Sequence, residues 1–393
     1  MAVTVAILLV GAHRGGATAH TVATSRPRRS GSAATSTSSA PPTTAAPATS
    51  TTSSSTTTTT LPPRPTGVGL ARCTFVDTTR STYDYATGKV LPGRQLPTEI
   101  RYPTAASGAT DLTGEQPDAP PVNRAGGWPT IFFAPGYNVT PGTYAALLDA
   151  WVRAGFVVVA PSFPDTNPTA VAAARFGYPE DDLTNQPADL AFVIRSSLAA
   201  SAGTTTTCPA LRGLVLPSSV GVAGQSDGGD TVALLAYGTS GPGTGAGAGL
   251  PIGAAAVLSG SEWYGDTYGA PAGAPPLLIT QSPTDQCNPP QQSVQLYDAV
   301  PLASKWFVTL GEADHLGPYD GDAAAAFDAV VAATTGFFKL ELAGATPSVA
   351  SLAAAVAPAG DGATVTGGPT APALPTLPFV KAACARPPGI RTS

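Results

Sequence analysis

Short, wholly apolar runs that alternate with helical stretches are the feature that most constrains how this chain can fold. Strands buried on both faces read as such continuous runs, whereas strands with one wet face alternate apolar and polar residues. Strand-like runs occur at 130–134, 156–160, 219–223, 252–258, 276–280 and 305–310, and helical stretches at 141–154, 187–200, 227–237, 291–300 and 323–340. This alternation predicts an α/β fold, with a mostly parallel central sheet and helices on both faces.

The stretch 141–154 has the apolar spacing of a helix. Its apolar residues Tyr144, Leu147, Leu148, Trp151 and Val152 recur at helical spacing and form one stripe. A stripe of this kind packs on a core, so we expect all five side chains to serve the interior.

The N-terminal region has the composition of an exported, tethered protein. Residues 1–19 contain an apolar run followed by an Ala-Thr-Ala cleavage pattern, which predicts a signal peptide although no basic residue precedes the run. Residues 20–66 are rich in Ser, Thr and Pro and predict a disordered linker. We therefore expect a secreted or cell-surface bacterial protein, with its linker suited to cell-wall association.

The folded part is predicted to span 67–342. Residues 343–393 read as an Ala/Pro/Gly-rich tail, packed on the domain or trailing from it, in which only Cys384 looks anchored. The four cysteines, Cys73, Cys208, Cys287 and Cys384, suggest two disulfides in an exported domain. The sequence leaves all three pairings open.

Composition excludes several classes of function. The net charge is −5 and no basic run occurs, so a nucleic-acid partner is not expected. No apolar stretch approaches the roughly 20 residues of a membrane span. The cysteines are too far apart for a metal knuckle and histidine is scarce, so we do not expect metal binding.

The segment Gly224–Gln225–Ser226–Asp227–Gly228 is a G-x-S-x-G motif placed between a predicted strand and a predicted helix. A serine on such a turn is exposed as a nucleophile, and small residues two places either side let the turn close. The motif alone is weak in a Gly-rich chain, but this position makes Ser226 the candidate nucleophile.

Elimination identifies the base. The chain holds three histidines, His13, His20 and His315, and the first two lie in or beside the predicted signal segment. His315 directly follows the predicted strand 305–310, at the edge of a parallel sheet where active sites form. We expect it to take the proton of the serine hydroxyl.

A carboxylate should orient the imidazole of His315. Asp285 follows the strand 276–280 and gives the chain order Ser, Asp, His. Asp314 adjoins His315, where the two side chains diverge, and Asp266 and Asp298 are less well placed. Asp285 is therefore the predicted third member.

Ester cleavage also needs donors for a developing oxyanion. We predict the backbone N–H groups of Asp227, just after the nucleophile, and of Tyr137, in the loop after the strand 130–134. Gly136 would allow close approach there, and Tyr137 is also a candidate substrate contact.

The segments FFAPGY, AGFVVVAPSFP, GVAGQSDGG, PPLLITQSPTDQ and LGEADH resemble the dienelactone-hydrolase-like α/β-hydrolases, close to bacterial cutinases and platelet-activating-factor acetylhydrolases. LPTEIRYP looks like the N-terminal strand of that group. The resemblance covers roughly 73–342. It implies an α/β-hydrolase fold without a large lid domain, hydrolysis of carboxylic esters without a cofactor, and the triad Ser226, Asp285 and His315.

The resemblance also makes Trp263 a candidate substrate contact, since cutinase-like enzymes carry a Trp there; a core or rim aromatic is the alternative. Asp227 departs from the family, which usually has an apolar residue at this position, and predicts a more acidic cleft. The loop 161–186 is longer than in cutinases and could cover the cleft.

The sequence thus predicts a monomeric secreted serine esterase with an open site for small or polymeric esters of short or medium acyl length. Two alternatives stay open. The same triad could cleave an amide or a lactone, or the domain could be an inactive surface-tethered binding module.

Overall fold

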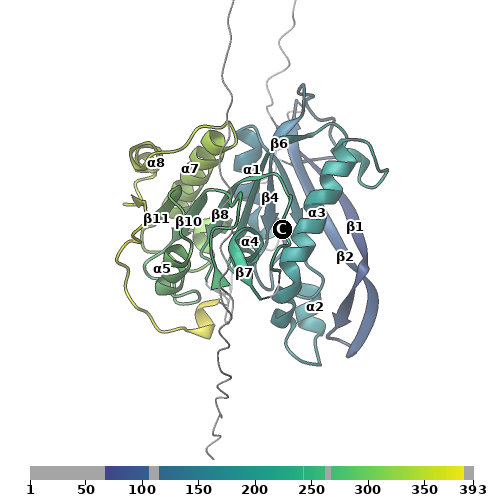
Figure 1. Cartoon of the computed structure of the whole chain (residues 1–393), viewed down its shortest axis with the longest axis horizontal. Coiled ribbons are helices and arrows are strands. Elements are labelled where there is room, and N and C mark those ends of the chain that lie inside the picture. Colours follow the sequence, from purple (N-terminus) through teal and green to yellow (C-terminus); the bar gives the residue numbers. More distant parts are fainter. Residues whose placement is uncertain (1–66, 106–114, 242, 262–266, 385–393) are drawn as a thin grey trace, which may run out of the picture. The chain divides into compact units, whose positions relative to one another are not determined.

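A ten-stranded sheet organises the residues that the computed structural model describes, namely 67–105, 115–241, 243–261 and 267–384 (Figure 1). Its strand order is β12-β11-β10-β8-β6-β4-β5-β2-β1-β3, and a separate two-stranded sheet pairs β7 with β9. The strands are β1 (Gly67–Asp84), β2 (Lys89–Thr104), β3 (Glu115–Pro117), β4 (Trp128–Ala134), β5 (Val157–Pro161), β6 (Val215–Gln225), β7 (Gly238–Ser240), β8 (Ile252–Leu258), β9 (Thr267–Tyr268), β10 (Leu277–Gln281), β11 (Lys305–Thr309) and β12 (Thr364–Gly367).

The middle of the large sheet is parallel. Strands β11, β10, β8, β6, β4 and β5 run in one direction, while β12 at one edge and β2 near the other are antiparallel to their neighbours. These six strands are the ones that apolar runs predicted. The mostly parallel sheet is confirmed, and its carboxyl ends lie along one edge, where the site is built.

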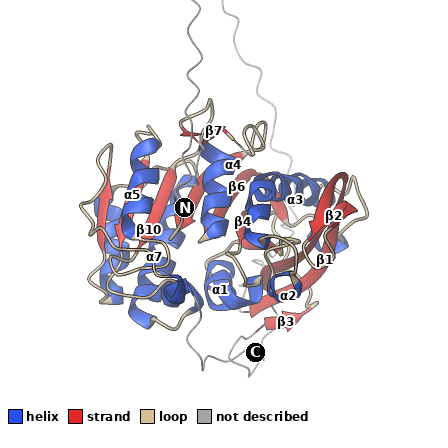
Figure 2. Cartoon of the chain, turned by 90° about the horizontal axis from the view of Figure 1, so that it is seen from below, coloured by secondary structure: helices blue, strands red, loops and turns tan. Residues whose placement is uncertain are grey.

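Helices cover both faces of this sheet. Figure 2 shows α3, α4 and α5 on one side and α1 and α7 on the other. The helices are α1 (Ala145–Arg153), α2 (Pro168–Ala173), α3 (Gln186–Ser201), α4 (Asp227–Tyr237), α5 (Pro290–Ala299), α6 (Gly317–Asp320), α7 (Ala324–Glu341) and α8 (Val349–Val356). Each face has its own core of buried apolar side chains, so the sheet is dry on both sides.

Two parts of the fold, one in the sheet and one outside it, were not expected in this form. The long hairpin β1–β2 pairs antiparallel from Gly67 with Thr104 to Asp84 with Lys89, although only the region around Glu99 resembled a strand in the sequence. The stretch 161–186, predicted as a loop, contains α2 and a 3-10 segment η2 (Pro179–Asn185), and Asn167 caps α2 by accepting the N–H groups of Thr169 and Ala170.

The C-terminal region is more integrated than its composition suggested. Strand β12 pairs with β11, and α8 buries Leu352 and Val356 against the domain. The expectation that only Cys384 anchors the region beyond 343 was therefore wrong. The Ala-, Pro- and Gly-rich composition of this region gave no sign of β12, the strand that forms one edge of the sheet.

The two disulfides are Cys73–Cys208 and Cys287–Cys384. The first ties the hairpin to the segment before β6. The second fixes a 3-10 turn, η5 (Lys381–Cys384), beside the loop after β10. None of the helices in the described part of the chain combines the length and the apolar character that a membrane crossing requires.

Buried charges also fasten the hairpin to the 161–186 stretch. Arg94 is fully buried and its Nη2 lies 2.7 Å from Asp182 Oδ2 and 2.6 Å from Asp189 Oδ2. Burial, and then the neighbouring charge of Asp182, raises the pKa of Asp165 to about 7. Arg80 Nη2 also lies 2.5 Å from Asp189 Oδ1, so the cluster holds two paired guanidiniums among several carboxyls, because a buried charge needs such partners.

Candidate active site

Ser226 lies at the turn between β6 and α4, where its φ is 56° and its ψ −128°. Such a conformation is strained for a residue other than glycine. The flanking glycines explain the motif. A Cβ on Gly224 would strike the carbonyl of Gly228, and a Cβ on Gly228 would strike the carbonyl of Ala134. Only hydrogen at both positions lets the turn close.

The structure brings the three predicted catalytic residues into one hydrogen-bonded chain. His315 Nε2 lies 2.9 Å from Ser226 Oγ, and His315 Nδ1 lies 2.8 Å from Asp285 Oδ2. All three side chains are buried, with exposed fractions of 9% for Ser226, 8% for His315 and 1% for Asp285. The serine is therefore within proton-transfer reach of an imidazole whose far nitrogen faces a carboxylate.

The surroundings of Asp285 favour its ionised form. Burial acts to raise the pKa of Asp285, but the charge of His315 and hydrogen bonds from His315, Ser259 and the Asn288 N–H outweigh it, so the pKa lies below its usual value. The N–H of Cys287 donates to Asp285 Oδ1 at 2.9 Å. The carboxylate can thus hold an imidazolium at neutral pH.

The competing carboxylates lie elsewhere. Asp314 accepts the N–H groups of Leu316 and Gly317, at 3.2 and 2.6 Å, and so starts α6 rather than facing the imidazole. Asp298 lies on α5, where its charge acts on Lys305. Asp266 lies outside the described residues.

The loop after β4 approaches the nucleophile closely. A Cβ on Gly136 would lie 3.1 Å from Ser226 Cβ. The Gly136 N–H donates to Tyr144 Oη and the Asn138 N–H to the Thr166 carbonyl, whereas the Tyr137 N–H has no such partner among the described residues. At the first position of α4, the Asp227 N–H has no intrahelical partner. Among the described residues, neither predicted donor N–H is thus bonded to the backbone carbonyl of another residue.

A group of buried carboxyls adjoins these donors. Burial first, and then the charges of Asp230 and Glu180, raises the pKa of Asp227 well above its usual value. Asp227 Oδ2 is buried without a hydrogen-bond partner among the described residues. Burial also raises the pKa of Asp230 to about 7. Burial therefore favours the uncharged form of Asp227, which runs against the more acidic cleft predicted from the sequence.

Two further residues, Gln225 and Ser259, contact the predicted triad and a third, Tyr144, contacts Gln225, and the sequence did not single them out as site residues. Gln225 reaches His315 through its amide, Tyr144 reaches Gln225, and Ser259 Oγ donates to Asp285. Ser259 directly follows β8, so its position at a strand's carboxyl end was a usable signal. Tyr144 was assigned to the core stripe because helical spacing does not reveal where a hydroxyl points.

Other candidate features lie outside this cluster. Trp263 falls outside the described residues.

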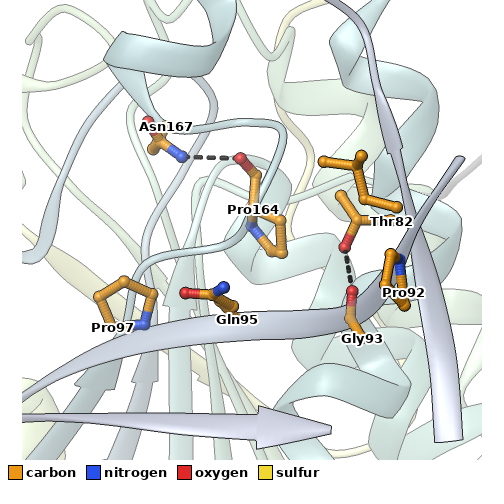
Figure 3. A pocket seen from close by; sticks show the side chains of 8 residues that line it. Thr82, Pro92, Gly93, Gln95, Pro97, Pro164 and Asn167 are labelled. Carbon is orange, nitrogen blue, oxygen red and sulfur yellow. Dashed lines mark hydrogen bonds between the residues drawn. The ribbon is translucent and has the colours of Figure 1, made fainter. Parts of the chain in front are cut away.

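A cavity of about 290 Å³ lies between the β1–β2 hairpin and the loop after β5, and no predicted site residue lines it (Figure 3). There, Asn167 Nδ2 donates to the Pro164 carbonyl at 2.8 Å. Within the described residues, no group of His, Cys, Asp and Glu side chains is arranged to hold a metal ion.

Comparisons with known proteins support the fold. Neither the protein-family models nor the curated proteins gave a match. Among solved structures, the chain is similar to a ferulic acid esterase from Streptomyces cinnamoneus, with 16% identity and a TM-score of 0.52, covering 77% of this chain and 96% of that one. At this identity the likeness concerns the fold alone. The chain thus has an α/β-hydrolase fold, without a large lid in its described part.

Proposed function

We propose that this protein is a secreted serine esterase that cleaves carboxylic esters through an acyl-enzyme on Ser226. The observation that carries the proposal is the continuous hydrogen-bonded chain from Ser226 Oγ through His315 to Asp285. It begins at a strained strand-to-helix turn, as a nucleophile in this fold requires.

In the first half of the reaction, Ser226 Oγ attacks the ester carbonyl carbon while His315 Nε2 takes the hydroxyl proton. Asp285 accepts the Nδ1–H and stabilises the imidazolium. The N–H groups of Tyr137 and Asp227 donate to the oxyanion of the tetrahedral intermediate. The C–O bond to the alcohol then breaks as His315 passes its proton to the leaving oxygen.

In the second half, His315 takes a proton from water, which attacks the acyl carbon. The bond to Ser226 Oγ breaks, its oxygen regains a proton from His315, and the carboxylic acid leaves. The raised pKa of Asp227 suits this cycle, because an ionised carboxylate beside the donors would oppose the developing negative charge.

We propose small or polymeric esters of short to medium acyl length as substrates. Only the short elements α2 and η2 occupy the 161–186 stretch, so a deep lidded channel is not required. The ferulic acid esterase among the similar structures makes hydroxycinnamate esters a sensible addition to a substrate panel. Two disulfides are typical of exported domains and support secretion.

The test is hydrolysis by the purified chain of p-nitrophenyl esters from acetate to palmitate, methyl ferulate and a polyester film. We expect turnover that is highest for short or medium acyl chains and lost in Ser226→Ala. Ser197→Ala is the matched control, since this buried serine on α3 has no hydrogen-bond partner among the described residues. A preference for palmitate with interfacial activation would contradict the open site. No hydrolysis of any ester would contradict the function.

A further inference from the structure

The residue before the nucleophile contacts two separate loops of the site at once. Gln225 is the last residue of β6 and is 1% exposed. Its Oε1 accepts the hydroxyl of Tyr144 at 2.7 Å, and its Nε2 donates to the backbone carbonyl of His315 at 3.2 Å. The Gln225 amide thus joins the end of β6, next to Ser226, to the residue that precedes α1 and to the loop that carries His315.

The contact continues to the predicted oxyanion loop. Tyr144 is fully buried, and its hydroxyl accepts the Gly136 N–H at 3.2 Å while it donates to Gln225. The Gly136 N–H immediately precedes the peptide whose N–H belongs to Tyr137. Fixing the first of these groups therefore limits the rotation of the second, because consecutive peptide planes share only two soft dihedrals.

We propose that Gln225 and Tyr144 form a positioning clamp that fixes the Tyr137 N–H and His315 relative to Ser226. The inference rests on the proposed function, since it assigns these residues a part in that reaction. Neither residue bonds to substrate in the proposed reaction; they act through the groups they hold.

The amide nitrogen of Gln225 has a second neighbour in the proton-transfer path. It lies 3.3 Å from His315 Nε2, the same atom that lies 2.9 Å from Ser226 Oγ. When His315 is neutral with its proton on Nδ1, His315 Nε2 can accept hydrogen bonds from the Gln225 amide and from the Ser226 hydroxyl. After proton transfer His315 Nε2 carries a proton and can accept neither bond. The bond from the Gln225 amide to the His315 carbonyl then keeps the amide in place.

Two variants separate the contacts of the clamp. Tyr144→Phe removes only the hydroxyl, so the Gly136 N–H loses its partner while the contact of Gln225 with His315 stays. Gln225→Met removes the bonds of the amide to Tyr144 and to the His315 carbonyl at nearly constant volume, so Tyr144 loses the partner that holds its hydroxyl toward the Gly136 N–H. Loss of one oxyanion donor costs about a hundred- to a thousandfold in kcat, so a displaced donor should cost about ten- to a hundredfold.

The expected result for Tyr144→Phe is that kcat and kcat/KM fall by the same factor while KM stays constant, since the lost interaction exists only in the transition state. Gln225→Met should fall at least as far. The double variant should lose little more than Gln225→Met alone, because both changes break one chain of contacts. Tyr297→Phe is the control: the hydroxyl of this buried tyrosine lies 2.7 Å from the Gly368 carbonyl and 3.1 Å from the Lys305 carbonyl and bonds no triad residue, so its loss should leave kcat unchanged.

The outcomes distinguish failure of the clamp from failure of the proposed function. If the wild-type chain hydrolyses esters but Tyr144→Phe keeps its full kcat, or the two losses multiply, or only KM rises, the clamp is refuted and the proposed function stands. If the wild-type chain hydrolyses no ester, the proposed function itself fails and the inference fails with it. Tyr144→Phe keeps the test valid even where Gln225→Met does not fold.

Discussion

Opening each disulfide in turn should separate folding stability from catalysis. The bridge Cys73–Cys208 closes a loop with a sequence separation of 135, and Cys287–Cys384 one of 97. The chain-entropy relation gives about 5 kcal/mol of stability for each, because loop-closure entropy grows only slowly with length. Replacing either pair by alanine should therefore lower the free energy of unfolding by a similar amount.

The catalytic consequences should differ. Cys287 lies two residues after Asp285 and donates its N–H to that carboxylate, and the Val380 N–H donates to the Gln286 carbonyl at 2.8 Å. Cys73 lies opposite Thr98 in the hairpin. Cys287→Ala/Cys384→Ala should therefore lower kcat about tenfold, the effect of losing about 1.4 kcal/mol of transition-state stabilisation.

Urea unfolding followed by tryptophan fluorescence measures the first effect, and ester turnover under conditions where both variants are folded measures the second. Cys73→Ala/Cys208→Ala is the matched control, with equal entropy loss and unchanged kcat. Equal kcat in the two double variants would refute the link between the second bridge and Asp285. A stability loss below about 1 kcal/mol in either would refute the loop-closure reasoning.

Three further predictions concern buried polar groups. Ser259→Ala should lower kcat about tenfold without changing KM, because Asp285 loses a donor worth about 1.5–3 kcal/mol; an unchanged kcat would show that the other donors suffice. Asp230 has a pKa of about 7 in the folded protein against about 4 unfolded, so its proton stabilises the fold at low pH and this stability is lost as pH rises from about 4 to about 7. Asp230→Asn should therefore match the wild type at pH 4 and exceed its free energy of unfolding by on the order of 4 kcal/mol at pH 8, and parallel pH profiles in urea would contradict this. Arg94→Met should cost about 3–5 kcal/mol by stranding buried carboxylates, whereas Arg72→Met, at a pair whose arginine side chain is 65% exposed, should cost less than about 1; equal costs would overturn the argument.

Local patterns in the sequence predicted the parallel core of the sheet and selected the residues of the candidate triad. The six apolar runs became β4, β5, β6, β8, β10 and β11, because a strand buried on both faces leaves its mark in composition. Ser226 was found from its motif and position, and His315 by elimination, since both depend on residue type and chain order alone.

Features that depend on distant contacts were not predictable. The bond between Tyr144 and Gln225 joins residues 81 positions apart, and periodicity assigned Tyr144 only to the core. The raised pKa of Asp227 follows from its burial, which the fold decides. The hairpin β1–β2 and the edge strand β12 are poor in apolar runs and gain their order from pairing with neighbours.

Labelling with a fluorophosphonate probe, followed by mass-spectrometric mapping of the modified peptide, tests the central claim that His315 activates Ser226. The account predicts one modification, at Ser226, that is lost in His315→Ala and retained in the control Ser197→Ala. Folded wild-type protein that stays unlabelled, or a label on Ser226 that persists without His315, would contradict the account.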